Sequence, residues 1–173
     1  MSEDKRPAPR ALGARNKARL WMLVGSLALV GSDLAVKAIV ELQLSRGQTI
    51  EGGLVDLRLH FNQGVAFSFG ADLPPVVILL GTAILILGLS WFLLSTAGTL
   101  GRLGLVGGAM VLGGALGNFL DRLAGDGVVD YLHVGWFATF NLADVFITVG
   151  AALLILATLL TGSGSKPPIS SPP

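Results

Sequence analysis

The chain has 173 residues, of which 52 % are hydrophobic and only 13 % are charged, with a net charge of +1 and a mean hydropathy of +0.72. Soluble domains carry about 25 % charged residues, so the composition favours a membrane protein. The chain contains no cysteine, which excludes disulfides, thiolate nucleophiles and cysteine-bound metals. Its length is enough for one domain.

Four stretches are long and apolar enough to cross a bilayer as helices, which takes roughly 20 mainly apolar residues. They cover about residues 20–40, 76–97, 103–120 and 142–161. A cleavable signal peptide is a poorer interpretation of the first stretch. The apolar core of such a peptide is shorter and uncharged, whereas this one holds Asp33 and Lys37, and no small-residue cleavage pattern follows it.

The distribution of basic residues predicts the orientation. Eight fall on the side of the termini and of the connection between the second and third spans: Lys5, Arg6, Arg10, Arg15, Lys17, Arg19, Arg102 and Lys166. Three fall on the other side: Arg46, Arg58 and Arg122. Because basic loops stay in the cytoplasm, both termini should be cytoplasmic, and residues 41–75 and 121–141 should face outward.

The expected organisation is a single four-helix transmembrane domain over residues 20–162. A basic cytoplasmic tail, residues 1–19, precedes it, and a Pro/Ser-rich disordered cytoplasmic tail, residues 163–173, follows it. The basic tail is better explained as a signal for topology and anionic lipid than as a nucleic-acid site.

Residues 55–62 (VDLRLHFN) alternate apolar and polar side chains, which predicts a half-buried strand. The following stretch, residues 63–70, contains another short extended run between glycines. We therefore expect a small antiparallel sheet over residues 47–70, within a β-rich outer segment of about residues 41–75. The sheet must lie at the membrane surface, because open sheet edges are not tolerated in hydrocarbon. It is either a packing element or a platform to which an extended peptide adds as a strand.

Polar residues gather near the outer ends of the spans. The set is Asp33 and Lys37 on the first, Asn118, Asp121 and Arg122 on the third, Asn141 and Asp144 on the fourth, with Asn62 and Asp130 in the outer segments. A structural interpretation pairs Asp33 with Lys37 and uses the asparagines as hydrogen-bonding contacts between helices. For Asp121 with Arg122, structural and functional interpretations remain open.

Asp130 and Asp144 differ from the other acids because neither has a lysine or arginine at helical spacing; His133 is the nearest titratable group to Asp130. Two such acids at one depth would repel each other if both were ionised. Sharing one proton avoids the repulsion and splits their titration. This arrangement supplies one general base and one general acid, as in aspartic proteases.

Other chemistries find little support in the sequence. There is no HExxH, no GxSxG and no glycine-rich phosphate loop, and two isolated histidines make a thin metal site. We therefore expect no metal and no cofactor. Gly113 and Gly117 have the spacing that permits close helix approach. An ion-coupled transporter and a non-catalytic assembly protein are the rival functions. A transporter site should lie near the midplane and often between internal repeats, neither of which is evident.

Five motifs occur in order: SDLAVK (32–37), FNQGVAFS (61–68), GGALGNFLDR (113–122), VVDY (128–131) and FNLAD (140–144). Together with four spans, they resemble the bacterial lipoprotein signal peptidase (signal peptidase II) family over about residues 20–160. The resemblance implies an aspartic endopeptidase of the cytoplasmic (inner) membrane, with its site at the outer face. It implies cleavage of prolipoproteins before a diacylglyceryl-modified cysteine. The expected partners are these substrates, membrane lipids and globomycin-type inhibitors, without nucleic acid, and we expect a monomer.

The resemblance also implies roles for individual residues. Asp130 and Asp144 match the catalytic pair. The supporting positions are Asn62, Gly64, Asn118, Arg122 and Asn141, and Asp33 matches a motif acid that we take to be structural. Apart from the resemblance, we expect Asp121 to be held by basic partners such as Arg122 and to shape the site. Two departures concern substrate fit: Val65 replaces a usual alanine, and the spacing of 14 between Asp130 and Asp144 is short.

Overall fold

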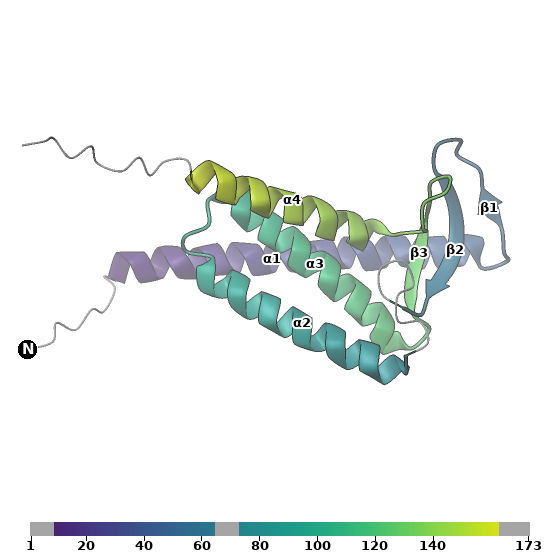
Figure 1. Cartoon of the computed structure of the whole chain (residues 1–173), viewed down its shortest axis with the longest axis horizontal. Helices are drawn as coiled ribbons and strands as arrows, with labels where there is room; N and C mark the ends of the chain where they lie inside the picture. Colours follow the sequence, from purple (N-terminus) through teal and green to yellow (C-terminus); the bar gives the residue numbers. More distant parts are fainter. Residues whose placement is uncertain (1–8, 65–72, 163–173) are drawn as a thin grey trace, which may run out of the picture.

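A computed structural model describes residues 9–64 and 73–162 of the chain, as four long helices and three strands. In chain order these are α1 (Pro9–Leu44), β1 (Thr49–Ile50), β2 (Asp56–Asn62), α2 (Pro75–Thr96), α3 (Arg102–Ala124), β3 (Val128–His133) and α4 (Leu142–Gly162) (Figure 1). All four helices are long and apolar enough to cross a membrane, which confirms the expected fold class.

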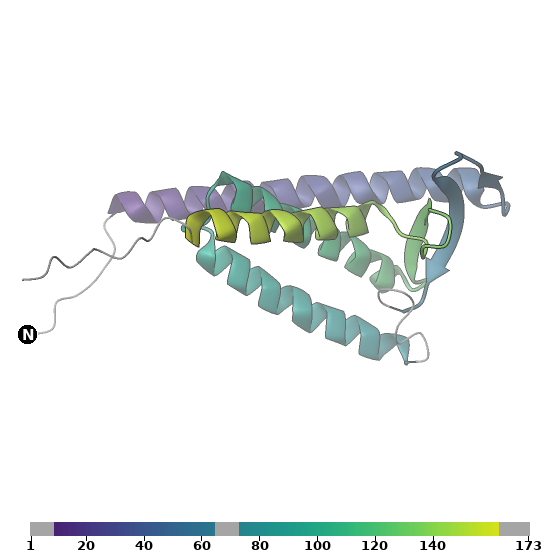
Figure 2. The ribbon, with the colours of Figure 1, turned by 45° about the horizontal axis from the view of Figure 1, so that its top comes forward.

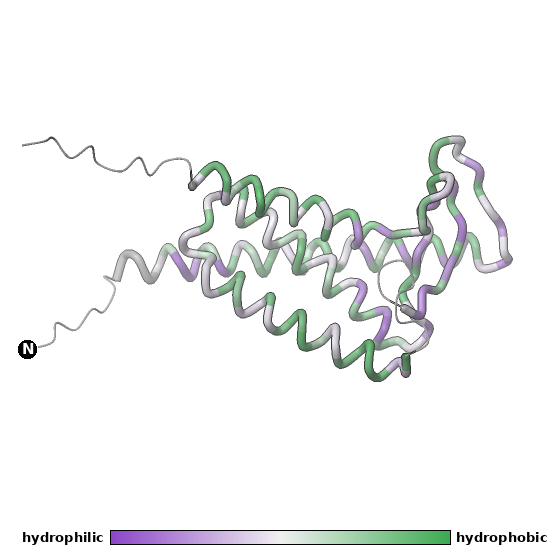
Figure 3. The backbone as a smooth tube through the Cα atoms, viewed as in Figure 1, coloured by the Kyte–Doolittle hydropathy of each residue, from purple (hydrophilic) through white to green (hydrophobic). Residues whose placement is uncertain are grey.

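Successive helices run in opposite directions, so α1 begins and α4 ends at the end of the bundle opposite the sheet (Figure 1). Hydrophilic residues gather near the sheet end, while the helices are largely hydrophobic (Figure 3). Helices α2, α3 and α4 match the predicted spans to within a few residues. Helix α1 is longer at both ends than its predicted span, so residues 9–19 are helical.

Helix α3 is the centre of the bundle and packs on all three other helices, most extensively on α4 and α1. Its glycines make this approach possible, because they leave room for the neighbouring backbone. A Cβ on Gly113 would lie 2.8 Å from Cβ of Leu29 on α1, and one on Gly114 would collide with the carbonyl of Ala143 on α4. The expectation of close packing at Gly113 is therefore confirmed. Helix α2 diverges from α4 toward the sheet end (Figure 2).

The three strands form one antiparallel sheet in the order β1-β2-β3. Strands β1 and β2 lie where the sequence predicted a sheet. Strand β3 corrects the sequence analysis, which placed Asp130 in an outer segment, residues 121–141, without expecting a strand there. The sheet packs on the end of α1, where Val40, Leu44 and Tyr131 form a buried cluster with partly buried neighbours. The second predicted extended run, Val65 and the tail at 163–173 lie largely or wholly outside the described residues.

Candidate active site

Asp144 lies in the first turn of α4, where Asn141 caps the helix. The Asn141 side-chain oxygen accepts a hydrogen bond from the Asp144 N–H (3.0 Å), and the Asn141 N–H donates to Asp144 Oδ2 (3.2 Å). This reciprocal pair has the geometry of a capping box. The positive end of the helix dipole favours a negative charge at Asp144.

Two other elements bind the remaining free N–H groups of this turn. The Leu142 N–H donates to the Tyr131 hydroxyl on β3 (3.2 Å), and the Ala143 N–H donates to Asp33 Oδ1 on α1 (3.0 Å). Burial raises the pKa of Tyr131 to about 12, so its hydroxyl stays protonated. Asp33 thus connects α1 with the first turn of α4. Tyr131 was missed by the sequence analysis, although it is the chain's single tyrosine and directly follows Asp130.

Asp130 lies on β3 with only 2 % of its surface exposed. Its Oδ1 accepts a hydrogen bond from the Asn141 side-chain amide (2.7 Å), and its Oδ2 accepts one from the Asn62 amide (3.0 Å). Asn141 therefore contacts both acids, Asp130 through its side chain and Asp144 through its backbone. The structure brings together the two carboxyl groups that the sequence singled out.

Burial raises the pKa of Asp130 from 3.8 to about 6. This value is the net result of several causes: burial is the largest, the nearby charge of Asp144 also raises the pKa, and the amides of Asn62 and Asn141 and the charge of Lys37 lower it. A pKa near neutrality allows Asp130 to hold a proton beside a charged partner. Two carboxyl groups in different environments can then take different roles in acid–base chemistry.

Asn118 on α3 supports Asp144. Its Nδ2 donates to Asp144 Oδ1 (2.8 Å), while its Oδ1 accepts from the Lys37 ammonium (2.9 Å) and from the Asn141 amide (3.0 Å). A lysine ammonium can only donate hydrogen bonds. Lys37 therefore fixes the orientation of the Asn118 amide, with its NH₂ group toward Asp144.

Lys37 is the centre of a buried ion cluster, because its ammonium lies 2.7 Å from both Asp33 Oδ2 and Asp121 Oδ2. Asp121 is therefore held by a basic partner, as expected, but the partner in contact is Lys37 on α1 and not the Arg122 that the expectation named, since neighbouring residues on a helix do not face each other. Asp121 also accepts the Val129 N–H at the start of β3 (3.1 Å). The sequence analysis recognised Lys37 only as the partner of Asp33.

Arg122 instead faces the segment that follows β2. Its guanidinium donates to the Gly64 carbonyl (2.8 Å) and to the Asn118 carbonyl (3.2 Å). The Gly64 N–H in turn donates to the Asn62 side-chain oxygen (3.0 Å). Gly64 thus connects Arg122 with the asparagine that contacts Asp130.

A cavity of about 630 Å³ opens between α2, α3 and α4 beside the two acids. Asn62, Asn118, Arg122, Asp130 and Asp144 line its polar end, and Thr82, Leu85, Ile86, Val145 and Val149 contribute to its remaining wall. Asp33, Asp121 and Asn141 lie behind this lining and support it. Within residues 9–64 and 73–162, no three metal-ligating side chains gather in a possible metal site.

Comparison with known proteins identifies relatives of this arrangement. The family described as signal peptidase (SPase) II matches residues 26–160. A lipoprotein signal peptidase of Ectopseudomonas mendocina (strain ymp) is 39 % identical over 160 residues, which cover 84 % of this chain and 91 % of that protein. One of Salmonella typhi is 37 % identical over 159 residues, which cover 85 % and 91 %. A bacterial membrane enzyme solved by the in meso method at 2.3 Å resolution has a TM-score of 0.74 at 25 % identity and covers 87 % of this chain and 94 % of its own.

Proposed function

The chain belongs to the signal peptidase II family, and we propose that it is an aspartic endopeptidase that processes bacterial prolipoproteins. In this proposal it removes their signal peptides by cleaving before a diacylglyceryl-modified cysteine. The observation that carries the proposal is the placement of Asp130 and Asp144. Both contact one asparagine, and both line the polar end of a cavity between transmembrane helices.

The environments of the two acids suggest their roles. Asp144 lies at the positive end of α4 and accepts hydrogen bonds from the Asn118 amide and the Asn141 N–H, so we assign it as the charged base. Asp130 is buried, and its raised pKa favours the protonated acid. Asp144 takes a proton from a water molecule, which attacks the scissile carbonyl carbon, while Asp130 donates a hydrogen bond to the carbonyl oxygen. The proton on Asp144 then passes to the leaving amine as the C–N bond breaks.

The cavity suits a substrate that is polar at one end and apolar at the other. Arg122 and Asn118 lie beside the acids, where they can hold the substrate backbone. The wall formed by α2 and α4 is largely apolar and lies within the spans, so it can receive lipid chains. The strands β1 and β2 remain candidates for pairing with the extended peptide.

We place the protein in the bacterial inner membrane with both termini in the cytoplasm and the acids at the outer face. The supporting observations are the basic residues near the termini and the position of the sheet at the opposite end of the bundle (Figure 1). A reporter fused after residue 163 should be cytoplasmic, and one inserted near Asp126 should be exported. An exported C-terminal reporter would contradict the four-span topology.

The proposed chemistry is tested by cleavage of a prolipoprotein in detergent, followed as a gel shift with and without globomycin. Asp130→Asn and Asp144→Asn should each reduce turnover to near background, because acid and base act as a unit. Both variants should still fold and bind globomycin. Asp126→Asn, which removes an exposed carboxyl from the same outer region, is the matched control. An active Asp130→Asn beside a folded but inactive Asp121→Asn would refute the assignment.

A further inference from the structure

Residues 134–140 form an apolar loop within the connection between β3 and α4, and the proposed chemistry uses only part of it. We call it the aromatic loop. Its sequence, VGWFATF, contains no ionisable residue. Trp136 at its tip is 94 % exposed, the largest value among the exposed large hydrophobic side chains of the described residues. An aromatic ring of this size presented to water is costly, so its surroundings require an explanation.

The aromatic loop is held firmly at its base. The Phe140 N–H donates to the Leu132 carbonyl (3.0 Å), and the Leu132 N–H donates back to the Phe140 carbonyl (2.8 Å). Arg58 on β2 donates to the Thr139 hydroxyl (3.3 Å from Nε) and lies 2.7 Å from Nδ1 of His133. These contacts fix both ends of the loop, so the exposed tip is a fixed feature of the fold.

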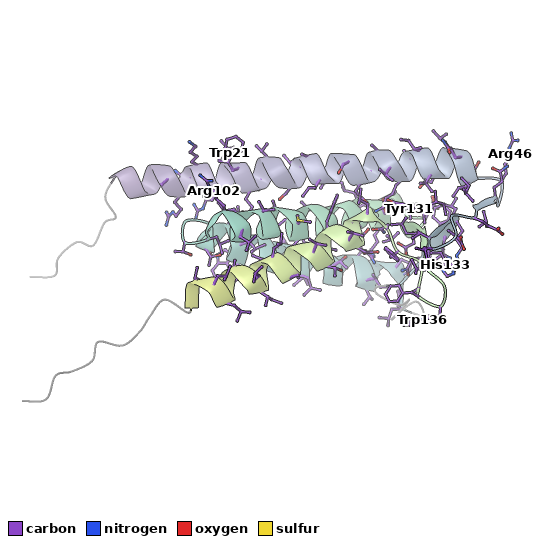
Figure 4. The ribbon with its side chains drawn as sticks, turned by 90° about the horizontal axis from the view of Figure 1, so that it is seen from above. Trp21, Arg46, Arg102, Tyr131, His133 and Trp136 are labelled. Carbon is purple, nitrogen blue, oxygen red and sulfur yellow. The ribbon has the colours of Figure 1, made fainter. Side chains whose placement is uncertain are left out.

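An edge-to-face series of aromatic rings connects the tip with the cavity. The ring centroids of Trp136 and Phe137 are 5.9 Å apart, as are those of Phe137 and Phe140. Phe137 and Phe140 also line the cavity that contains the two acids. Trp136 projects from the side of the molecule at the sheet end of the bundle, away from Tyr131 and His133 (Figure 4). A series of ring contacts therefore joins the tip to the wall of the cavity.

We infer that the aromatic loop is an interfacial anchor whose tip lies at the headgroup–acyl boundary of the outer leaflet. Three observations select lipid as its partner. The loop leads directly into the membrane span of α4, it carries no charge that would oppose contact with lipid, and its exposed side chain is tryptophan. Tryptophan is enriched at membrane interfaces because its ring is apolar while its N–H remains near water.

The anchor has a consequence for access to the cavity. The ring series joins Trp136 to Phe140 at the cavity wall, so contact of the tip with lipid holds the cavity mouth at the level of the leaflet. A substrate with lipid chains then reaches Asp130 and Asp144 without leaving the bilayer. This consequence rests on the proposed function, whereas the depth of Trp136 does not.

Fluorescence quenching in vesicles measures that depth. The chain has three tryptophans, so Trp21→Phe and Trp91→Phe together leave Trp136 as the only one. In phosphatidylcholine vesicles, bromines near the headgroup end of the acyl chain should quench Trp136 more than bromines placed deeper, and aqueous iodide should quench it weakly. A chain that keeps only Trp91, which is 74 % exposed on α2, provides the reference within a span.

Two quenching results would overturn the inference. Strong quenching by iodide, without quenching by either brominated lipid, would place the tip in water. If neither iodide nor the brominated lipids quench Trp136, and quenching appears when the protein is diluted in the bilayer, the tip lies against a second copy of the chain. Because no substrate is used, both results are independent of the proposed function.

Turnover supplies the second measurement. Trp136→Ser should raise KM for a lipid-modified prolipoprotein severalfold in vesicles and leave it unchanged in detergent. Trp136→Phe, which keeps an apolar ring, should remain much closer to the parent chain. An equal rise of KM in vesicles and in detergent would indicate a direct contact between Trp136 and the substrate and would contradict the anchor.

Discussion

Replacing Asp130 by asparagine should stabilise the protein at alkaline pH while removing its activity. Burial raises the pKa of Asp130 from 3.8 to about 6, so the folded state favours the protonated carboxyl. Below pH 4 this group is protonated in the folded and unfolded states alike, and its full stabilising effect is present. As the pH rises from about 4 to 6, the unfolded state gains by ionising first, and the free energy of unfolding falls.

The size of the effect follows from the shift in pKa. One pKa unit corresponds to about 1.4 kcal/mol, so the shift of about two units amounts to about 3 kcal/mol. For a chain of this length that difference corresponds to roughly 6–12 °C in the thermal midpoint. The substituted asparagine would also present an NH₂ group to one of the two amides that now donate to Asp130, at a cost of about 1 kcal/mol that does not depend on pH.

The assay is thermal unfolding in detergent from pH 4.5 to 8, with the difference between Asp130→Asn and the parent chain as the measured quantity. Comparing this difference at the two pH values cancels the constant hydrogen-bond cost. We expect the thermal midpoint of the variant to rise by several degrees relative to that of the parent chain as the pH rises. The same comparison for Asp126→Asn should stay flat, because Asp126 is exposed. If the difference in thermal midpoint for Asp130→Asn does not change with pH, the inference that the buried Asp130 carboxyl is costly to ionise is wrong.

Three further changes test other parts of the structure. Lys37→Met should lower the thermal midpoint more than Asp121→Asn, because it leaves two buried carboxylates without their cation. Breaking such pairs costs about 3–5 kcal/mol. Equal midpoints for the two variants would contradict a cation shared by Asp33 and Asp121. Gly114→Ala should destabilise the detergent-solubilised protein by roughly 1–3 kcal/mol because its Cβ would collide with α4, whereas Gly88→Ala meets open space and should be tolerated. Leu57→Pro should weaken prolipoprotein cleavage in an inserted protein, because it removes a donor from the central strand; unchanged turnover would exclude the sheet as a substrate platform.

The parts of the fold that depend on local pattern could be predicted from the sequence. Continuous apolar runs locate the helices, because each must be long enough to cross the hydrocarbon. Alternation over residues 55–62 locates β2, because one face packs on α1 while the other remains more exposed. Asp130 and Asp144 could be singled out because no lysine or arginine lies near either in sequence.

The parts that depend on distant partners could not be predicted in this way. Val128, Val129, Asp130 and Tyr131 are all buried, so β3 shows no alternation, and its partner β2 is far away in the sequence. Asp121 was assigned to Arg122 because the two are adjacent, yet its counter-charge lies on another helix. Pairs of this kind are set by the packing of α1 on α3.

The placement of the acids explains why ionisable groups are tolerated beside a span. The N–H groups of the first turn of α4 are bound by Tyr131 of β3, by Asp33 of α1 and by Asn141 next to the helix. Each of these residues is also connected to another part of the site. Tyr131 directly follows Asp130, Asp33 forms an ion pair with Lys37, and the Asn141 amide donates a hydrogen bond to Asp130. The geometry around Asp144 therefore exists only when the helices and the sheet have assembled. A carboxylate that would be costly in lipid alone is instead held by groups that the fold must satisfy in any case.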